Sequence, residues 1–225
     1  MCIRDSSKGT EWELTAQPIR NWNVTLNFAT TNATHIQIDP ATVALMANLE
    51  TFFNGPGGQI RMWSNGGGNG NLIGFNWTNN VYNPYLTEVA SEGQRAPDLP
   101  SWTANAVTTY NFDRGPLKGW LIGGAFREES SRILGYQYNA TLNGGLGGLD
   151  VSKPWNGPEE SHVDLWLGYQ RRMFANKINW RTQLNVTNVG QSTTLKAAQY
   201  EPDGSLALAR IENGMEWTLT NTFDF

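Results

Sequence analysis

The most regular feature of this sequence is an alternation of apolar and polar residues. In one example, Trp22, Val24, Leu26 and Phe28 are apolar, and the residues between them are asparagine or threonine. A period of two places the apolar side chains on one face of a β-strand and the polar side chains on the other. We therefore expect seven strands, formed by residues 11–17, 21–28, 102–112, 120–126, 162–172, 178–186 and 215–225.

The connections between these segments alternate between short and long. The first and second segments, the third and fourth, and the fifth and sixth are joined by only a few residues each. Long connections follow the second, fourth and sixth segments, at about residues 31–100, 130–160 and 189–205. Bacterial transmembrane β-barrels have short periplasmic turns and long extracellular loops. The sequence therefore favours an all-β, antiparallel transmembrane β-barrel architecture with long extracellular loops.

The positions of the aromatic residues agree with a membrane location. Trp102 and Tyr110 lie on one face of the same segment, separated by about 27 Å along the strand. For a strand tilted by about 40° this becomes roughly 20 Å along the membrane normal, close to the height of the apolar band. Arg171 is the exception among the apolar faces, and we expect it near a short turn, where its side chain can reach the interface.

A soluble, secreted, glycan-binding β-sandwich is the alternative. A sheet with one buried and one wet face gives the same alternation of residues. The polar faces of these segments, however, contain many asparagine, threonine and glutamine residues and few lysine or glutamate residues. That composition suits a water-filled lumen better than an open protein surface.

Composition removes several other classes of protein. Only 16% of the 225 residues are charged, against roughly 25% in ordinary soluble domains, whereas 12% are aromatic. The net charge of −4 provides no basic surface for nucleic acid. No run approaches the 18 apolar residues of a transmembrane helix. One cysteine, Cys2, and two histidines, His35 and His162, exclude a disulfide framework and a Cys/His zinc site.

The long 31–100 connection contains the candidate ligand contacts. Asp39 followed by Pro40 is typical of a helix start, and the apolar residues up to Gly55 have helical spacing, so we expect a short helix there. Beyond it lie aromatic residues with asparagine neighbours, a combination that can hold a flat ligand or a sugar. Equally, these rings can pack the loop against its own helix. The four candidates are Trp63, Trp77, Tyr82 and Tyr85.

Residues 1–7 lack any periodicity, and we expect them to be non-native or disordered. Residues 8–225 then form the barrel segment. If the short turns are periplasmic, the first and the last of the seven strands both run inward. A complete single-chain bacterial barrel has an even number of strands. We therefore expect an open piece of a larger barrel.

Several motifs resemble the C-terminal part of the β-barrel of TonB-dependent outer-membrane receptors. They are GTEWEL at 9–14 leading into PIRNWNVT at 18–25, LPSWTAN at 99–105, RTQLNVTN at 181–188 and TNTFDF at 220–225. The resemblance covers residues 8–225 and implies the last third of a barrel of roughly 22 strands. The plug domain and the TonB box of the family are absent from this sequence.

The resemblance implies a transport function in the outer membrane of a Gram-negative bacterium. The expected cargo is a scarce nutrient of the siderophore, cobalamin or glycan class. The implied partners are outer-membrane lipid, the barrel-assembly machinery, the TonB complex acting through the absent plug, and the small-molecule or glycan cargo, but not nucleic acid. Because the family carries out transport, the chain is expected not to be an enzyme and to need no cofactor.

The last strand also resembles the C-terminal assembly signal of outer-membrane proteins. Such a signal has a polar residue, then a glycine two positions on, then alternating hydrophobic residues that end in an aromatic. Thr220 occupies the position where glycine is usual, a departure that weakens the match. The residues assigned to this signal are Trp217, Thr218, Leu219, Phe223 and Phe225.

Patterns for enzyme chemistry are missing. The sequence has no GxSxG, HExxH, Walker A or CxxC motif, and we predict no catalytic, cofactor-binding or metal-binding residues. Glu159 and Glu160 beside His162 can form a carboxylate pair or a metal site, but a solvated loop end is the favoured interpretation. The glycine-rich segments 66–71 and 144–148 are predicted to be flexible loop tips.

Overall fold

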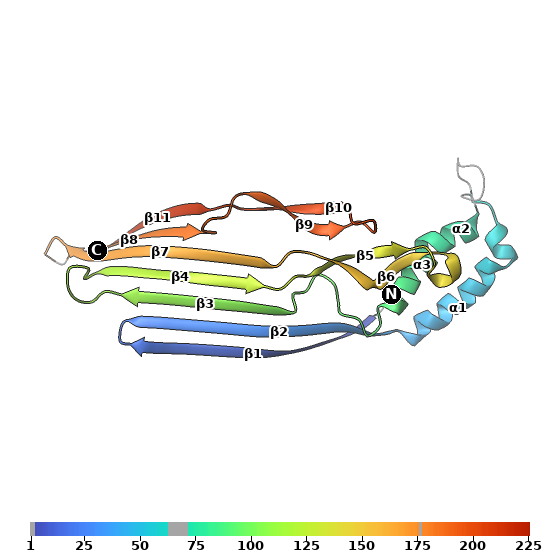
Figure 1. Ribbon diagram of the computed structural model, residues 1–225, viewed down its shortest axis with the longest axis horizontal. Helices are drawn as coiled ribbons and strands as arrows, with labels where there is room; N and C mark the ends of the chain where they lie inside the picture. Colours follow the sequence, from blue (N-terminus) through green and yellow to red (C-terminus); the bar gives the residue numbers. More distant parts are fainter. Residues whose placement is uncertain (1–2, 63–71, 176) are drawn as a thin grey trace.

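A computed structural model describes residues 3–62, 72–175 and 177–225. Its largest element is a seven-stranded antiparallel sheet with the order β1-β2-β3-β4-β7-β8-β11 (Figure 1). Each of the seven predicted segments forms one of these strands, so the antiparallel all-β prediction is confirmed. The strands are β1 (Ile3–Ile19), β2 (Trp22–Ile38), β3 (Trp102–Asn111), β4 (Trp120–Glu129), β7 (Glu160–Met173), β8 (Ile178–Thr187) and β11 (Glu216–Asp224).

The first two strands are much longer than their sequence patterns indicate. Ile3–Ser7, in the segment expected to be non-native or disordered, belong to β1 and pair with β2, where Ser7 lies opposite Ala33. β2 continues to Ile38, so the long connection begins well after residue 31. The two strands therefore form a hairpin that extends beyond the rest of the sheet (Figure 1).

Strand register places the predicted apolar residues that lie within the strands on one face of the sheet. Leu26 lies opposite Leu14 on one side and Ala106 on the other. In the same way, Leu167 lies opposite Ile122 and Leu184. Directly paired residues share a face of a sheet, so the seven alternating patterns combine into one apolar surface and one polar surface.

The connections confirm the predicted alternation of short and long segments. The turns between β1 and β2, β3 and β4, and β7 and β8 are short and lie at one end of the sheet (Figure 1). The long connections lie at the other end and carry helices and four further strands that the sequence pattern did not predict. These elements are α1 (Pro40–Asn54), η1 (Pro56–Gln59), α2 (Ile73–Trp77), η3 (Thr78–Tyr82), α3 (Asn83–Ala90), β5 (Ile133–Asn139), η4 (Asn143–Gly145), β6 (Gly148–Asn156), β9 (Thr194–Tyr200) and β10 (Leu206–Glu212).

Helix α1 starts and ends where the sequence predicts. The carboxylate of Asp39 accepts a hydrogen bond from the backbone N–H of Thr42 at 3.1 Å, and Pro40 is the first helical residue. These two features satisfy or remove N–H groups that would otherwise lack partners at a helix N-terminus. The helix ends before Gly55. Within the described ranges, no helix has the length and hydrophobicity required to cross a bilayer.

The loop segments pack against one another rather than extending separately into solvent. Strand β5 contacts the β9–β10 hairpin, where the backbone N–H of Tyr138 donates to the Pro202 carbonyl at 3.2 Å. At Gly135 a Cβ atom would lie only 2.8 Å from the carbonyl oxygen of Tyr200, so this contact requires glycine. The long connections therefore form a packed layer at one end of the sheet, which we call the loop layer.

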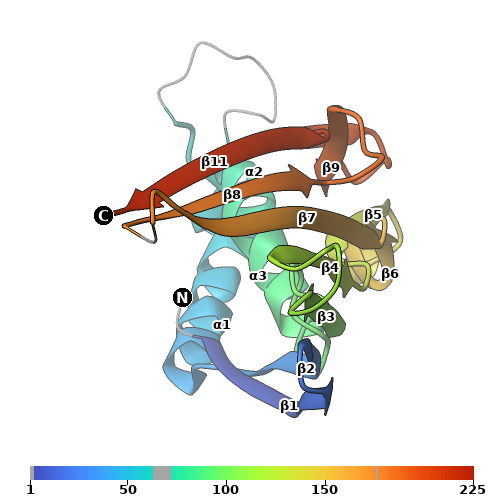
Figure 2. The ribbon, with the colours of Figure 1, turned by 90° about the vertical axis from the view of Figure 1, so that its left-hand side faces the viewer.

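Buried hydrophobic side chains lie in the loop layer and at the end of β2 next to it, not in the body of the sheet. The buried hydrophobic residues of the described chain are Ile38, Met46 and Trp77. The accessible surface is 14794 Å², against about 10,000 Å² expected for a compact monomer of this mass. Viewed from one end, the strands follow an arc from β1 through β4 to β11 (Figure 2). An arc with both faces uncovered is the shape of a piece of a barrel wall.

Candidate functional site

The apolar face of the sheet is the most extensive candidate surface. It exposes large hydrophobic side chains in β1, β2, β4, β7 and β11, including Trp12 (69% exposed), Leu219 (65%) and Ile122 (51%). Contiguous exposed apolar surface of this extent marks a protein or membrane contact rather than a surface in water. Arg171, which lies opposite Trp180 near the turn between β7 and β8, interrupts this face where the sequence predicts.

Aromatic rings gather at both ends of the apolar face. Near the short turns, the ring of Trp120 lies 5.0 Å from Tyr169, which lies 6.0 Å from Trp180. Near the loop layer, Phe28 stacks on Trp102 at 6.2 Å. Rings with an apolar body and a polar edge are typical of the two interfaces of a membrane. The predicted separation of Trp102 from Tyr110 is therefore part of a pattern that crosses several strands.

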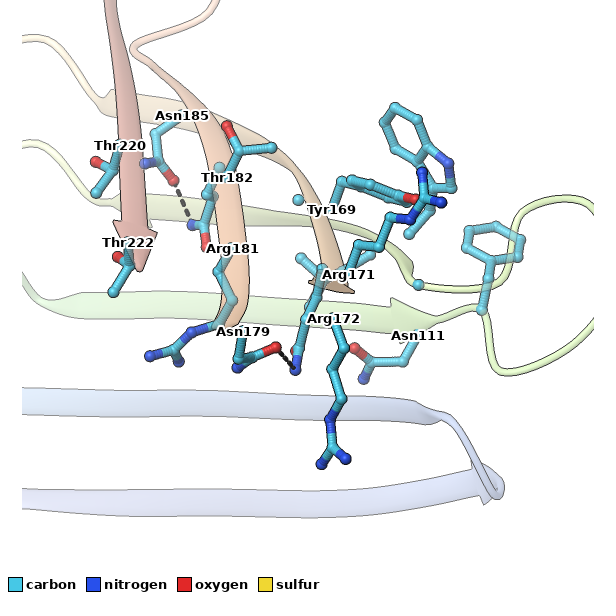
Figure 3. A pocket seen from close by; sticks show the side chains of 17 residues that line it. Asn111, Tyr169, Arg171, Arg172, Asn179, Arg181, Thr182, Asn185, Thr220 and Thr222 are labelled. Carbon is cyan, nitrogen blue, oxygen red and sulfur yellow. Dashed lines mark hydrogen bonds between the residues drawn. The ribbon is translucent and has the colours of Figure 1, made fainter. Parts of the chain in front are cut away.

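The polar face contains a cavity of about 660 Å³ near the short turns (Figure 3). Arg172 and Arg181 supply positive charge, and Arg181 forms an ion pair with Asp224 at 3.0 Å. Amide and hydroxyl groups form the rest of the polar lining, and Gln170 Nε2 donates to Asn179 Oδ1 at 3.1 Å. Residues from β4, β7, β8 and β11 meet here, so the cavity depends on strand register and was not predicted from the sequence.

Three of the four predicted ligand-contacting aromatics come together in the loop layer. Trp77 is buried, and its ring stacks on Phe53 of α1 at 4.6 Å. Tyr82 lies 6.1 Å from Trp77 and 6.2 Å from Tyr85. Trp63 lies outside the described residues. The loop thus packs against its own helix through Trp77, whereas Tyr82 and Tyr85 remain partly exposed.

The environment of Tyr82 perturbs its acidity. Burial disfavours the charged phenolate, and a hydrogen bond and the negative charge of Glu50 act in the same direction. Together these effects raise the pKa of Tyr82 to about 12. Tyr82 therefore remains a neutral hydrogen-bonding group through the whole physiological pH range.

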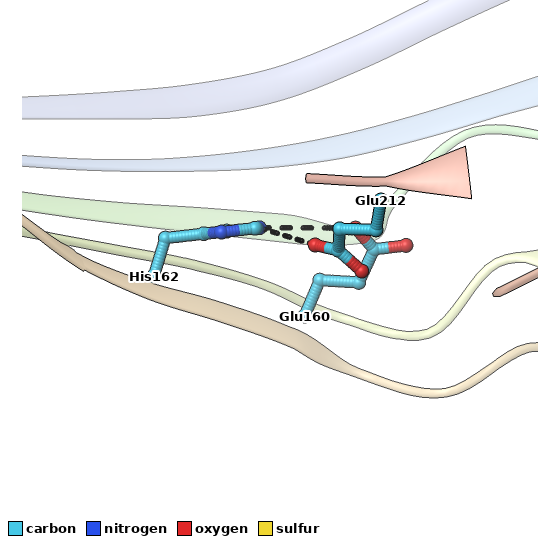
Figure 4. Close-up of side chains that lie close together, drawn as sticks. All are labelled: Glu160, His162 and Glu212. Carbon is cyan, nitrogen blue, oxygen red and sulfur yellow. Dashed lines mark ion pairs between the residues drawn. The ribbon is translucent and has the colours of Figure 1, made fainter. Parts of the chain in front are cut away.

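A cluster of charged side chains joins β7 to the β9–β10 hairpin (Figure 4). His162 Nε2 lies 3.3 Å from Glu212 Oε1 and 4.0 Å from Glu160 Oε2. Lys196 forms an ion pair with the other oxygen of Glu212, and Arg210 does so with the other oxygen of Glu160. The sequence favoured a solvated loop end here, but the Glu160 and Glu212 side chains are only 12% and 10% exposed.

The residues of the predicted assembly signal lie on both faces of β11. Trp217, Leu219 and Phe223 pair with Val186, Leu184 and Trp180 on the apolar face. Thr218 lies on the polar face opposite Asn185, and Phe225 follows the strand with 97% of its surface exposed. The register thus separates the apolar members of the motif from Thr218.

No family model matches the sequence. No curated protein matches it either. Two solved structures from Acinetobacter baumannii are similar in fold. The ferric preacinetobactin receptor BauA aligns with 99% of this chain at a TM-score of 0.57 and 11% identity. The siderophore receptor PiuA aligns with 99% of it at 0.52 and 13%.

The chain spans about a fifth of the length of these receptors, since 22% of each is covered. At such low identity the likeness concerns the fold alone. It shows that the arc of strands has the fold of part of the β-barrel wall of these two proteins.

Proposed function

We propose that the chain is the C-terminal barrel segment of a TonB-dependent outer-membrane receptor that imports a scarce nutrient. The observation that carries this proposal is the continuous apolar face, which crosses all seven strands and ends in aromatic rings at both edges. The similar fold of two siderophore receptors supports it.

The polar face supports a transport role rather than catalysis. It presents amide, hydroxyl and guanidinium groups around the 660 Å³ cavity, which suit a water-filled lumen or contact with a polar plug. In the proposed receptor this face lines the passage, and lipid covers the opposite face. The barrel-assembly machinery would contact β11, and the TonB complex would act through a plug supplied by the rest of the receptor.

The loop layer is the proposed site of cargo contact. Tyr82 and Tyr85 present partly exposed rings, and Trp77 holds them against α1. Rings with a polar edge bind flat chelates or sugars by stacking and hydrogen bonding. A siderophore, a cobalamin or a glycan fits this chemistry, and titration with a ferric trihydroxamate chelate, cyanocobalamin and maltohexaose separates the three.

A soluble glycan-binding sandwich has less support. A sandwich requires a second sheet across the apolar face, and within the described ranges no such sheet packs there.

Lipid contact provides the decisive experiment. The chain is folded into vesicles whose acyl chains carry bromine, and tryptophan fluorescence is measured. The proposal expects strong quenching, because Trp12, Trp120 and Trp217 lie on the apolar face. A water-soluble monomer with unquenched tryptophan fluorescence would contradict it.

A further inference from the structure

The charged cluster between β7 and the β9–β10 hairpin contains three acceptor atoms that converge on one point (Figure 4). Glu160 and His162 are two residues apart on one face of β7, and Glu212 approaches them from β10. One nitrogen or oxygen atom from each of the three side chains lies within 4.8 Å of the other two.

The hydrogen bonds of Asn188 define which nitrogen of His162 carries a proton. Asn188 Nδ2 donates to the Asn213 carbonyl at 3.1 Å, so Asn188 Oδ1 faces the imidazole. That oxygen lies 3.0 Å from His162 Nδ1 and can only accept, so Nδ1 must be the donor. In the neutral imidazole, Nε2 therefore directs its lone pair at the oxygens of Glu212 and Glu160.

Three lone pairs that face one another repel, and a metal ion between them would relieve this repulsion. Each carboxylate makes its shortest ion pair through the oxygen farther from His162: Arg210 binds Glu160 Oε1, and Lys196 binds Glu212 Oε2. The other oxygens remain directed toward His162. A histidine held through its second nitrogen and carboxylates hydrogen-bonded on their outer oxygens are common features around metal ligands.

We propose that Glu160, His162 and Glu212 bind a divalent first-row transition metal ion, which fastens the β9–β10 hairpin to β7. Ligands of a tetrahedral Zn²⁺ ion with bonds of about 2.0–2.2 Å lie about 3.3–3.6 Å apart. The separation of His162 Nε2 from Glu212 Oε1 is 3.3 Å, and Glu160 Oε2, at 4.0 Å, has to move closer by only a fraction of an ångström. One imidazole and two carboxylates suit Zn²⁺, Fe²⁺ or Mn²⁺.

The ammonium group of Lys196 would compete with the metal ion for the carboxylates of Glu160 and Glu212. This group lies 3.9 Å from Glu160 Oε2 and contacts Glu212 as well. Together with Arg210 it already neutralises the two carboxylates, so a divalent ion brings excess positive charge into the cluster. Binding is therefore expected to be moderate in the natural chain, and removal of the Lys196 charge should tighten it about tenfold or more.

Calorimetric titration of the whole chain in detergent micelles with ZnCl₂ at pH 7.5 tests the site. One saturable site is expected in the natural chain, lost in His162→Ala and kept in the matched control His35→Ala. Lys196→Gln should bind Zn²⁺ more tightly. Hydrogen exchange of the amides in β9 and β10 should slow when Zn²⁺ is added to the natural chain.

Two further measurements keep the test independent of variant folding. The visible absorption of Co²⁺ added to the natural chain should show the bands of a four- or five-coordinate ion. Equal Zn²⁺ affinity in the natural chain and in folded His162→Ala would overturn the proposal, as would the lack of binding in both the natural chain and Lys196→Gln. If hydrogen exchange in β9 and β10 slows on acidification alone and Zn²⁺ does not bind, a proton rather than a metal ion bridges the three side chains, and the proposal is wrong. None of these outcomes depends on whether the chain transports a nutrient.

Discussion

The ring of Trp77 lies nearly parallel to that of Phe53, with 4.6 Å between their centroids and 23° between their planes. This stack joins α1 to α2 and excludes water from one of the few buried positions of the described chain. Trp77→Ala should destabilise the loop layer by about 3–5 kcal/mol, the usual cost of truncating a buried tryptophan. Hydrogen exchange in α1 and α3 measures the effect.

The matched control for Trp77 is the aromatic residue two positions before it. Phe75 is 51% exposed, so Phe75→Ala should change the exchange rates by no more than the equivalent of about 0.5 kcal/mol. Similar effects of the two substitutions would show that the stack on Phe53 does not hold the loop layer together.

The raised pKa of Tyr82, about 12 against an ordinary value of 10.0, predicts a pH dependence. The folded-state pKa lies above the unfolded one, so the stabilising contribution of Tyr82 is complete below about pH 10 and is lost between about pH 10 and 12. Tyrosinate absorbance near 295 nm should show one tyrosine that ionises at a higher pH than the others and is missing in Tyr82→Phe.

The substitution Glu50→Gln tests whether Glu50 contributes to the raised pKa of Tyr82. Removal of the negative charge should lower the pKa of Tyr82 toward 10.0, while burial, the largest cause, keeps it above that value. If the absorbance titration above pH 11 is unchanged in Tyr82→Phe, Tyr82 is not the tyrosine with the raised pKa.

The features predicted well from sequence are those set by local patterns. Period-two alternation indicates strands because each strand has one apolar face, and the Asp39–Pro40 pair indicates the start of α1 because both residues act on the first helical turn. The four strands in the long connections, β5, β6, β9 and β10, were not predicted. Strand β6, for example, contains Pro154, shows no clean alternation and pairs with β5 through register shifts.

The features that sequence could not predict depend on contacts between distant segments. His162 and Glu212 are 50 positions apart in sequence, and no local pattern brings them to 3.3 Å. The polar cavity likewise needs the register that places Gln170 opposite Arg181. Such sites follow from topology, whereas the apolar face follows from residue order alone.

The extreme exposure of Phe225 allows the proposed assembly role to be separated from stability. Phe225 is 97% exposed and lies beyond the last paired residue of β11. Phe225→Ala should therefore leave the free energy of unfolding in detergent within about 0.5 kcal/mol of the natural value. If the residue belongs to the assembly signal, the same substitution should reduce the amount of protein in the outer membrane of expressing cells.

Phe174 is the matched control for Phe225. It is 71% exposed and lies in the short turn after β7. Phe174→Ala should leave outer-membrane levels unchanged. Equal losses in the two variants would indicate a general effect of removing exposed aromatics and would remove the reason for assigning Phe225 to the signal.

The two faces of β2 provide the sharpest test of the membrane location. Leu26 lies in the middle of the apolar face, opposite Leu14 and Ala106, and the next residue, Asn27, lies on the polar face opposite Glu13 and Asn105. Leu26→Arg should destabilise the chain in lipid vesicles by about 2–4 kcal/mol, the cost of a lipid-facing arginine at the bilayer midplane. Urea unfolding followed by tryptophan fluorescence measures this loss.

Asn27→Arg adds the same side chain one position along the strand. Its guanidinium would face water and the carboxylate of Glu13 on the other side of the sheet, so the expected change is below about 1 kcal/mol. In detergent-free buffer neither variant should fold better than the natural chain. If the two arginines cost the same in vesicles, the apolar face does not contact lipid, and the alternation of residues that defines this protein must serve a contact with another protein surface.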